Sequence, residues 1–162
     1  MLNLGFYSAG HISTNVRIYP TIVDRILEAT ALLFMLVFWG CTLWIYMHVS
    51  KESSIPPLFI LAGVNTLVYL LLAWGAYMPI RLINFPVRIT EQNVAIQWFL
   101  AKRLCRVLNI IVSLLFLSLV FMEVEQEYGL PKGFCEIGTA VTAVLTGIAL
   151  IVYYIIAFRN KK

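Results

Sequence analysis

Four long apolar segments without a charged residue constrain the fold of this chain more than any other feature. They cover residues 29–47, 55–80, 107–122 and 137–158. A helix needs about 20 apolar residues, each rising about 1.5 Å, to cross the roughly 30 Å hydrocarbon core of a bilayer. Backbone N–H and C=O groups in lipid must hydrogen-bond internally, and the segments lack the alternation of strands. The sequence therefore predicts an all-α fold, a four-span transmembrane helical bundle.

The predicted spans cover about residues 29–48, 56–80, 104–122 and 137–158. The third apolar segment is short, so we expect it to extend back to Leu104 while Arg106 snorkels outward. Composition agrees, because 61% of the 162 residues are hydrophobic and 12% are charged, whereas about one quarter of a soluble domain is charged. The lipid bilayer is therefore the expected partner of these helices.

The chain divides into a loosely ordered N-terminal segment, residues 1–20, and a four-helix transmembrane domain, residues 21–162. Thr21 can cap a helix, and Asp24 stands three residues later, close to a capping box. We therefore expect the first helix to begin near Ile22 and to run into the first span. A signal peptide is not expected, because the first apolar segment starts only near residue 29 and is long enough to span.

The basic residues lie mostly on one side of the predicted bundle. Ten of the 12 Lys and Arg residues fall in the N-terminal segment, in the 81–106 connector or at the C-terminus. Positively charged loops stay in the cytoplasm, so both termini and the connector are predicted to be cytoplasmic in a multi-pass membrane protein. These residues flank apolar segments rather than forming a patch with base-stacking aromatics, so nucleic acid is not an expected partner.

The connector is predicted to extend the third span into the cytoplasm as an amphipathic helix. Pro86 stops the preceding helix, and Thr90 is a good N-cap with Glu91 in the first turn. From there Lys102, Arg103 and Arg106 fall on one part of the helical wheel, while Trp98 lies on another. Either this helix is a topology anchor or it also docks a cytoplasmic partner. The candidate residues for membrane-interface contact or docking are Arg88, Trp98, Lys102, Arg103 and Arg106.

Small and polar residues within the spans are candidates for helix packing. Thr139, Ala143 and Gly147 recur at a spacing of four, and Gly138, Thr142 and Thr146 form a second stripe. Such stripes let helices approach closely, either within the chain or in a homo-oligomer or membrane-protein complex through the fourth helix. Asn65 and Asn109 are expected to hydrogen-bond across helices, and a substrate site is the alternative for them.

Motifs for catalysis are missing from the sequence. It has no P-loop, HExxH or GxSxG motif, and Cys41, Cys105 and Cys135 lack metal-ligand spacing. We predict no catalytic residue, no cofactor and no metal site. No ionisable residue lies deep in any predicted span, which argues against a pump but leaves a passive pore open. The acidic loop 123–136 is either a solvated loop or, with His48 nearby, a weak cation site.

The connector resembles that of a family of short bacterial membrane proteins called domain of unknown function 1648. The likeness extends over roughly residues 20–122 and includes the upstream "TIVDRILE" and "LWIY". In the connector the matching residues are Asn84, Phe85, Pro86, Val87, Arg88, Ile89, Thr90, Glu91, Asn93 and Arg103. The family's extracytoplasmic Pro-x-His-aromatic loop is not present in the 48–56 loop of this chain.

The resemblance implies a non-enzymatic role, because some relatives of the family are immunity proteins against a secreted membrane-active toxin and some sequester a regulator. We therefore expect an integral inner-membrane protein that serves immunity, sensing or regulation at the bacterial cell envelope. The alternatives are a small transporter or channel subunit, and an accessory subunit of a larger membrane complex.

Overall fold

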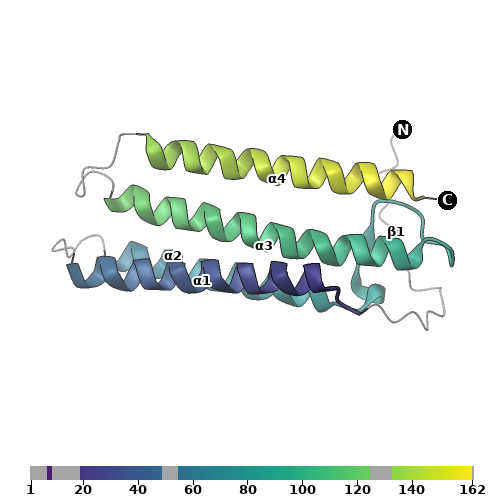
Figure 1. The fold of residues 1–162 in the computed structure, drawn as a ribbon, viewed down its shortest axis with the longest axis horizontal. Helices are drawn as coiled ribbons and strands as arrows, with labels where there is room; N and C mark the ends of the chain where they lie inside the picture. The colour runs from purple at the N-terminus through teal and green to yellow at the C-terminus, as the bar shows by residue number, and fades with distance from the viewer. Residues whose placement is uncertain (1–6, 9–18, 49–54, 125–132, 162) are drawn as a thin grey trace.

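The computed structural model describes residues 7–8, 19–48, 55–124 and 133–161, and four long helices make up most of them (Figure 1). In chain order these helices are α1 (Ile22–His48), α2 (Ile55–Tyr77), α3 (Val94–Val124) and α4 (Phe134–Arg159). All four are long and apolar enough to cross a membrane. The predicted all-α bundle of four transmembrane helices is therefore confirmed.

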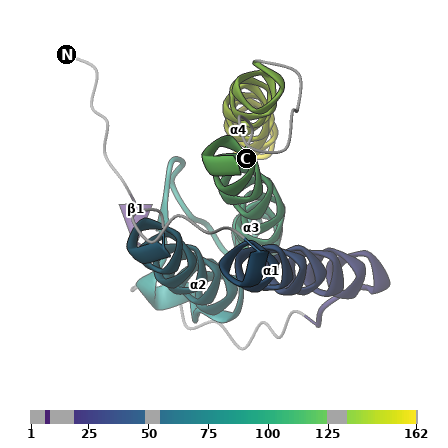
Figure 2. The same ribbon diagram turned by 90° about the vertical axis from the view of Figure 1, so that its left-hand side faces the viewer.

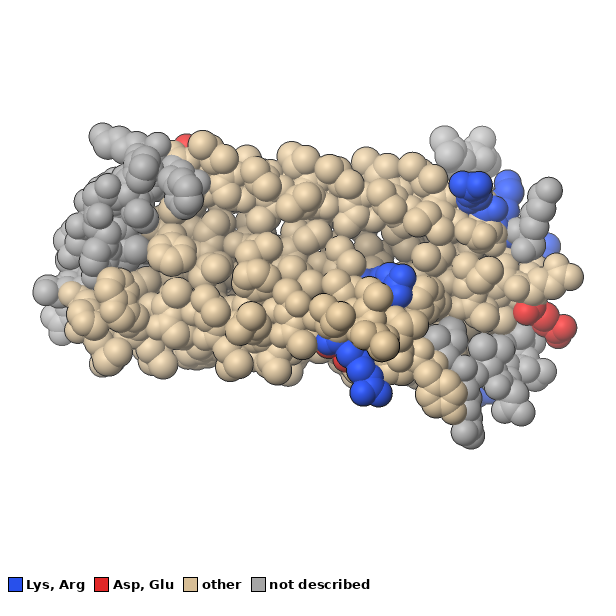
Figure 3. Space-filling model, viewed as in Figure 1, with Lys and Arg blue, Asp and Glu red and all other residues tan. Residues whose placement is uncertain are grey.

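Helix α3 is the centre of the bundle. It packs against each of the other three helices, α1 also packs against α2, and α4 packs chiefly on α3. The end-on view shows α3 between α4 and the pair formed by α1 and α2 (Figure 2). We call the end at which α1 and α3 begin, and α2 and α4 end, the basic end, because Lys and Arg side chains gather toward it on an otherwise mostly uncharged surface (Figure 3).

Local hydrogen bonds explain where the first and third helices begin. At the start of α1 the Thr21 N–H donates to Asp24 Oδ2 (2.9 Å) and the Asp24 N–H donates to Thr21 Oγ1 (3.3 Å). Thr90 and Asn93 make the same reciprocal pair before α3, at 2.9 and 3.3 Å. These bonds satisfy N–H groups that have no partner inside the helix. The predicted caps at Thr21 and Thr90 are confirmed, and α3 continues unbroken into the third span.

The connector between α2 and α3 is more structured than predicted. Helix α2 ends at Tyr77, three residues before the predicted end of the span, because Pro79 disfavours a helical Met78. A 3₁₀ helix, η2 (Ile80–Leu82), follows, and then the strand β2 (Asn84–Phe85).

Strand β2 pairs antiparallel with β1 (Tyr7–Ser8), so that Tyr7 faces Phe85. These strands were not among the predicted elements. The remaining residues of the segment predicted to be loosely ordered, except 19 and 20, lie outside the described part.

Two apolar clusters form the core. One lies between α1, α2 and α3 toward the end opposite the basic end, and it consists of Phe38, Ile45, Leu58, Ala62 and Val120. The other holds the connector against α3 at the basic end, and it consists of Ile80, Phe85, Val87, Ile89, Val94 and Ala101. Together they hold the helices and the connector in place around a charged junction between α1, α2 and α3.

Helix α4 meets α3 through the second of the two stripes of small residues. Thr142 is buried, and a Cβ added at Gly138 would lie 3.3 Å from the Ser118 Cβ of α3. In the first stripe Thr139 contacts α3 through a 3.1 Å hydrogen bond between its hydroxyl and that of Ser118. Ala143 is exposed, and a Cβ at Gly147 would meet nothing within 4 Å. The first stripe therefore lies at the margin of this interface.

Candidate functional site

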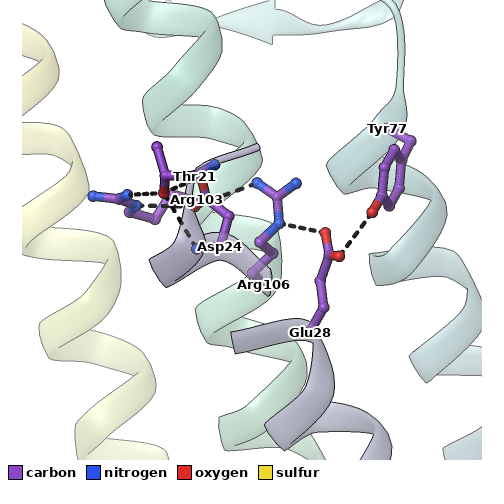
Figure 4. A network of polar contacts seen from close by, with 6 residues as sticks. All are labelled: Thr21, Asp24, Glu28, Tyr77, Arg103 and Arg106. Carbon is purple, nitrogen blue, oxygen red and sulfur yellow. Dashed lines mark hydrogen bonds and ion pairs between the residues drawn. The ribbon is translucent and has the colours of Figure 1, made fainter. Parts of the chain in front are cut away.

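A cluster of charged and hydroxyl side chains joins α1, α2 and α3 near the basic end (Figure 4). Two acids come from α1, two arginines come from α3 and a tyrosine comes from the last turn of α2, while a threonine precedes α1. We call this group the ion-pair cluster, and its members are Thr21, Asp24, Glu28, Tyr77, Arg103 and Arg106. Acids stand four apart on α1 and arginines three apart on α3, so each pair shares one helix face.

Asp24 is the hub of the ion-pair cluster. Its side chain is only 1% exposed. Its Oδ1 atom lies 3.2 Å from Arg103 Nε and 3.6 Å from Arg106 Nη1. Its Oδ2 atom accepts hydrogen bonds from the backbone N–H and the hydroxyl of Thr21, at 2.9 and 2.7 Å. Both carboxylate oxygens thus have charged or hydrogen-bonding partners, as a buried carboxylate requires.

Arg106 connects the three helices. Its Nε atom donates to Glu28 Oε1 at 2.7 Å, and Glu28 Oε2 accepts a 2.7 Å hydrogen bond from the Tyr77 hydroxyl. Figure 4 shows Arg106 between Asp24 and Glu28, with Tyr77 beyond Glu28. The prediction that Arg106 snorkels outward is wrong, because its side chain is 5% exposed. Two carboxylates on the neighbouring helix supply counter-charge in the interior.

The ion-pair cluster lies level with an uncharged part of α4. Arg103 lines the same groove as Val152, Tyr153 and Ile156, and α4 carries no charge between residues 137 and 158. Val152 precedes Phe158 by six residues, which is about 9 Å along a helix. Segment by segment, the sequence indicated no charge deep in a span. The assembled bundle places one buried arginine and its two acids inside the apolar belt that α4 defines.

A small cavity of about 30 Å³ adjoins the ion-pair cluster between the helices. Glu28, Tyr77, Arg106 and Asn109 are among its lining residues. The Asn109 Nδ2 atom donates to the Tyr69 carbonyl of α2 at 3.3 Å, which confirms the predicted cross-helix bond. Its Oδ1 atom is buried and has no hydrogen-bond partner among the described residues. The cavity is large enough for a water molecule, and Glu28, Tyr77, Arg106 and Asn109 carry polar groups beside it.

Asn65 behaves differently from Asn109. Its side chain is 1% exposed, yet neither its Nδ2 nor its Oδ1 atom has a hydrogen-bond partner in the part of the chain that the structure describes. The prediction that Asn65 hydrogen-bonds across helices is therefore wrong. The hydrogen bond between α1 and α2 at this depth comes from the next residue, because Trp39 Nε1 donates to the Thr66 hydroxyl at 3.0 Å.

The other candidate residues of the connector helix lie on different surfaces. Trp98 is half-buried, and its Nε1 atom donates to the carbonyl of Met78 just after α2, at 3.2 Å. The Lys102 ammonium lies 4.0 Å from the centre of the Trp98 ring, a cation–π contact. Arg88 is exposed on the connector. The structure brings Arg103 and Arg106 together with acids of α1 and leaves Lys102 and Arg88 outside the ion-pair cluster.

Two buried amides, Asn93 just before α3 and Gln97 within it, join the basic ends of α3 and α4, a role that was not predicted from the sequence. Asn93 Nδ2 donates to the Lys161 carbonyl at 3.1 Å. Gln97 Nε2 donates to the carbonyls of Ala157 and Asn160, at 3.0 and 3.1 Å. The last carbonyls of a helix lack intrahelical partners, so these amides cap α4 from outside. Two amides spaced four residues apart on the apolar side of a predicted helix were the sequence signal that could have indicated this contact.

Metal binding finds no support among the described residues, which contain no group of three or more His, Cys, Asp or Glu able to hold an ion. Residues 125–132 of the acidic loop lie outside the described part, and so does the proposed cation site with them.

Comparisons with family models, curated proteins and solved structures find no match for this chain. The interaction that the contacts of the ion-pair cluster show is charge pairing between helices.

Proposed function

We propose that this chain is a bacterial inner-membrane protein that acts by binding a partner, in immunity, sensing or regulation at the cell envelope, and not by catalysis. The resemblance of residues 84–93 to the family called domain of unknown function 1648 supports this role. The observation that carries the proposal is the closed junction of α1, α2 and α3. The polar groups of this junction mostly satisfy one another, so recognition falls to the outer surfaces and the connector.

The packing of the three helices supports a binding role over conduction by one chain. Phe38, Ile45, Leu58, Ala62 and Val120 are each 2% exposed or less and fill the interior toward the end opposite the basic end. Nearer the basic end, Arg106 is neutralised by two acids. An ion crossing between these helices would have to displace both layers, at a cost of several kcal/mol for each unpaired buried charge.

Deletion of the gene tests the binding role. The deletion strain is challenged with a panel of membrane-active peptides and with secretions of competitor strains, and it is complemented with the wild type or with variants. We expect increased sensitivity to one toxin and rescue by the wild type. Arg88→Gln tests whether the exposed connector takes part, and Arg81→Gln in η2 is the matched control. Unchanged sensitivity across the panel would count against immunity.

Orientation is part of the proposal, with both termini and the connector in the cytoplasm. The grouping of basic residues at one end of the bundle supports it. Reporter fusions after residues 50, 91 and 162 test it, using a phosphatase that is active outside the cytoplasm and a fluorescent protein that is active inside. We expect fluorescence at 91 and 162 and phosphatase activity at 50. The reverse pattern would overturn the assignment.

A small transporter or channel subunit is the second candidate function, and the position of the ion-pair cluster favours it. Ionisable residues within the apolar belt often mark ion pathways, and a water-sized cavity adjoins Glu28 and Arg106. Ion flux into proteoliposomes tests this function. Flux by the wild type that is lost in Glu28→Gln and retained in the exposed control Glu91→Gln would support transport, whereas impermeable vesicles would exclude it for the purified chain.

An accessory or oligomeric role would use the outer face of α4. This face is apolar and exposed, and it includes Val141, Val144, Ile148, Ile151 and Ile155. Lipid alone can cover such a face, so the test is the state of the protein after gentle detergent extraction. A co-purifying membrane protein or a stable dimer that Ile148→Trp disrupts would support association through α4. A monomer would leave the face to lipid.

A further inference from the structure

A groove between α3 and α4 near the basic end has apolar walls and one charged residue. Its volume is about 170 Å³, and only Arg103 among its lining residues is charged; the others are Leu100, Leu104, Val107, Ala149, Val152, Tyr153 and Ile156. Figure 3 shows hollows along the line where α4 meets the rest of the bundle. Cavities of about 150 Å³ with apolar walls bind small hydrocarbons, so this groove has room for part of a hydrocarbon chain.

The groove runs from the basic end toward the middle of the bundle. On α3 it extends from Leu100 to Val107, which is seven residues or about 10 Å along a helix. Gln97 contacts Ala157 on α4 just beyond Leu100, and α4 carries its next charge at Arg159. The mouth of the groove therefore lies close to the end of the apolar belt, where lipid headgroups begin.

The Arg103 side chain leans toward this mouth. Side chains on a helix point toward its N-terminus, and the N-terminus of α3 is at the basic end. The Arg103 Cζ atom lies 4.3 Å from the centre of the Phe99 ring, one turn nearer the mouth. Arg103 donates through Nε to Asp24 and through Nη2 to Thr21, and its side chain remains 35% exposed. Among the described residues, its Nη1 atom has no hydrogen-bond partner, so it can donate to another anion.

The charge around the ion-pair cluster also favours an anionic ligand. In the ion-pair cluster two acids balance two arginines. Arg25 on α1 follows Asp24 in the sequence, and Lys102 on α3 precedes Arg103. Neither Arg25 nor Lys102 forms an ion pair with a described residue. Counted with these two cations, the described residues around the ion-pair cluster carry a net positive charge. Phosphate oxygens of anionic lipids supply counter-charge at such positions.

We propose that the groove binds one anionic phospholipid, with an acyl chain along Leu104, Val107, Ala149 and Val152 and the phosphate at the Arg103 guanidinium. The acyl chain fills apolar space that the packing of α4 on α3 leaves open. The Arg103 guanidinium binds the phosphate of the same lipid. This site is independent of the proposed function of the protein, because it needs only insertion in a bilayer.

Native mass spectrometry of the detergent-extracted full chain tests the site. The probes are phosphatidylglycerol and phosphatidylcholine with identical dioleoyl chains, and inorganic phosphate as competitor. We expect one retained phosphatidylglycerol with a preference of about fivefold over phosphatidylcholine, because the choline cation offsets the phosphate charge and the difference is the attraction of one net negative charge to a basic residue. Equal retention of the two lipids would overturn the anionic assignment. Displacement of the lipid by millimolar phosphate would overturn the role of the groove.

Two variants separate the headgroup contact from the chain contact. Arg103→Gln should lower the preference for phosphatidylglycerol to the level of phosphatidylcholine, while Arg81→Gln, an exposed basic residue of η2, should not. Ala149→Phe fills the groove without changing charge and should abolish retention of both lipids, while Ala143→Phe on exposed α4 surface should not. Circular dichroism and thermal unfolding of each variant confirm folding. Unchanged retention in both test variants would refute the site.

Discussion

Replacing Arg106 and Arg103 separately by Gln should have very different effects on stability, although both arginines contact the same carboxylate. Arg106 is 5% exposed and contacts Asp24 and Glu28, whereas Arg103 is 35% exposed. Removing one partner of a buried ion pair costs about 3–5 kcal/mol in soluble proteins. Exposed pairs are worth about 0–1 kcal/mol. Burial should therefore decide the outcome.

The loss of stability expected for Arg106→Gln is smaller than this range, because both acids keep other partners. Asp24 keeps Arg103 and Thr21 as partners, and Glu28 keeps the Tyr77 hydroxyl. Alternative partners in the unfolded membrane state also weaken polar contacts between helices. We therefore expect Arg106→Gln to lower the free energy of unfolding by about 2–3 kcal/mol and Arg103→Gln by less than about 1 kcal/mol.

The assay is reversible unfolding in mixed micelles of a mild detergent and dodecyl sulfate, followed by circular dichroism. Glu91→Gln, an exposed residue of the connector, is the control for removing one charge. The double variant Arg103→Gln/Arg106→Gln measures the coupling through Asp24, which should leave the two effects non-additive. A loss for Arg103→Gln that equals or exceeds the loss for Arg106→Gln would refute the argument that burial sets the value of these ion pairs.

Three further predictions test packing and capping. Asn65→Leu should raise the free energy of unfolding by about 1–2 kcal/mol, because it removes a buried amide that has no hydrogen-bond partner among the described residues. Asn109→Leu should change stability less, because it removes one unpartnered oxygen but also loses a bond worth about 0.6 kcal/mol. Both are measured by the same unfolding assay, and destabilisation by Asn65→Leu would show that its amide has a partner. Gly147→Ala should gain up to about 1 kcal/mol from helix propensity, since nothing lies within 4 Å, while Gly138→Ala should gain nothing at a 3.3 Å contact; equal thermal shifts would contradict the assigned packing face. Gln97→Leu should increase amide hydrogen exchange in the last turn of α4, since two carbonyls there lose their donor, and unchanged exchange would contradict capping from α3.

Much of the fold follows from residues that are close together in the sequence. The four helices follow from the four uncharged segments, since backbone groups in lipid must pair internally. Their starts at Ile22 and near Thr90 follow from caps formed within three residues. The early end of α2 follows from Pro79. The prediction placed the end at residue 80 because it relied on the length of the apolar segment and not on this proline.

The site depended on contacts between distant segments. Arg106 and Glu28 are 78 residues apart, and Arg103 and Asp24 are 79 apart. The sequence contained all four residues near the predicted span ends, where outward snorkelling is the simplest arrangement for a single helix. Only the packing of α1 against α3 shows that Asp24 and Glu28 lie in the interior beside these arginines.

The sequence by itself determined how many helices this protein has, where they begin and how apolar they are, because these properties depend on local hydrogen bonding and on transfer to lipid. Tertiary structure alone decided which face of each helix points inward. It directs Arg106 toward Glu28, places the stripe of Gly138 against α3 and leaves Asn65 without a hydrogen-bond partner among the described residues. The physical reason is that a helix apolar on all sides has no hydrophobic pattern to set its rotation, so close packing and a few polar contacts with its neighbours set it instead.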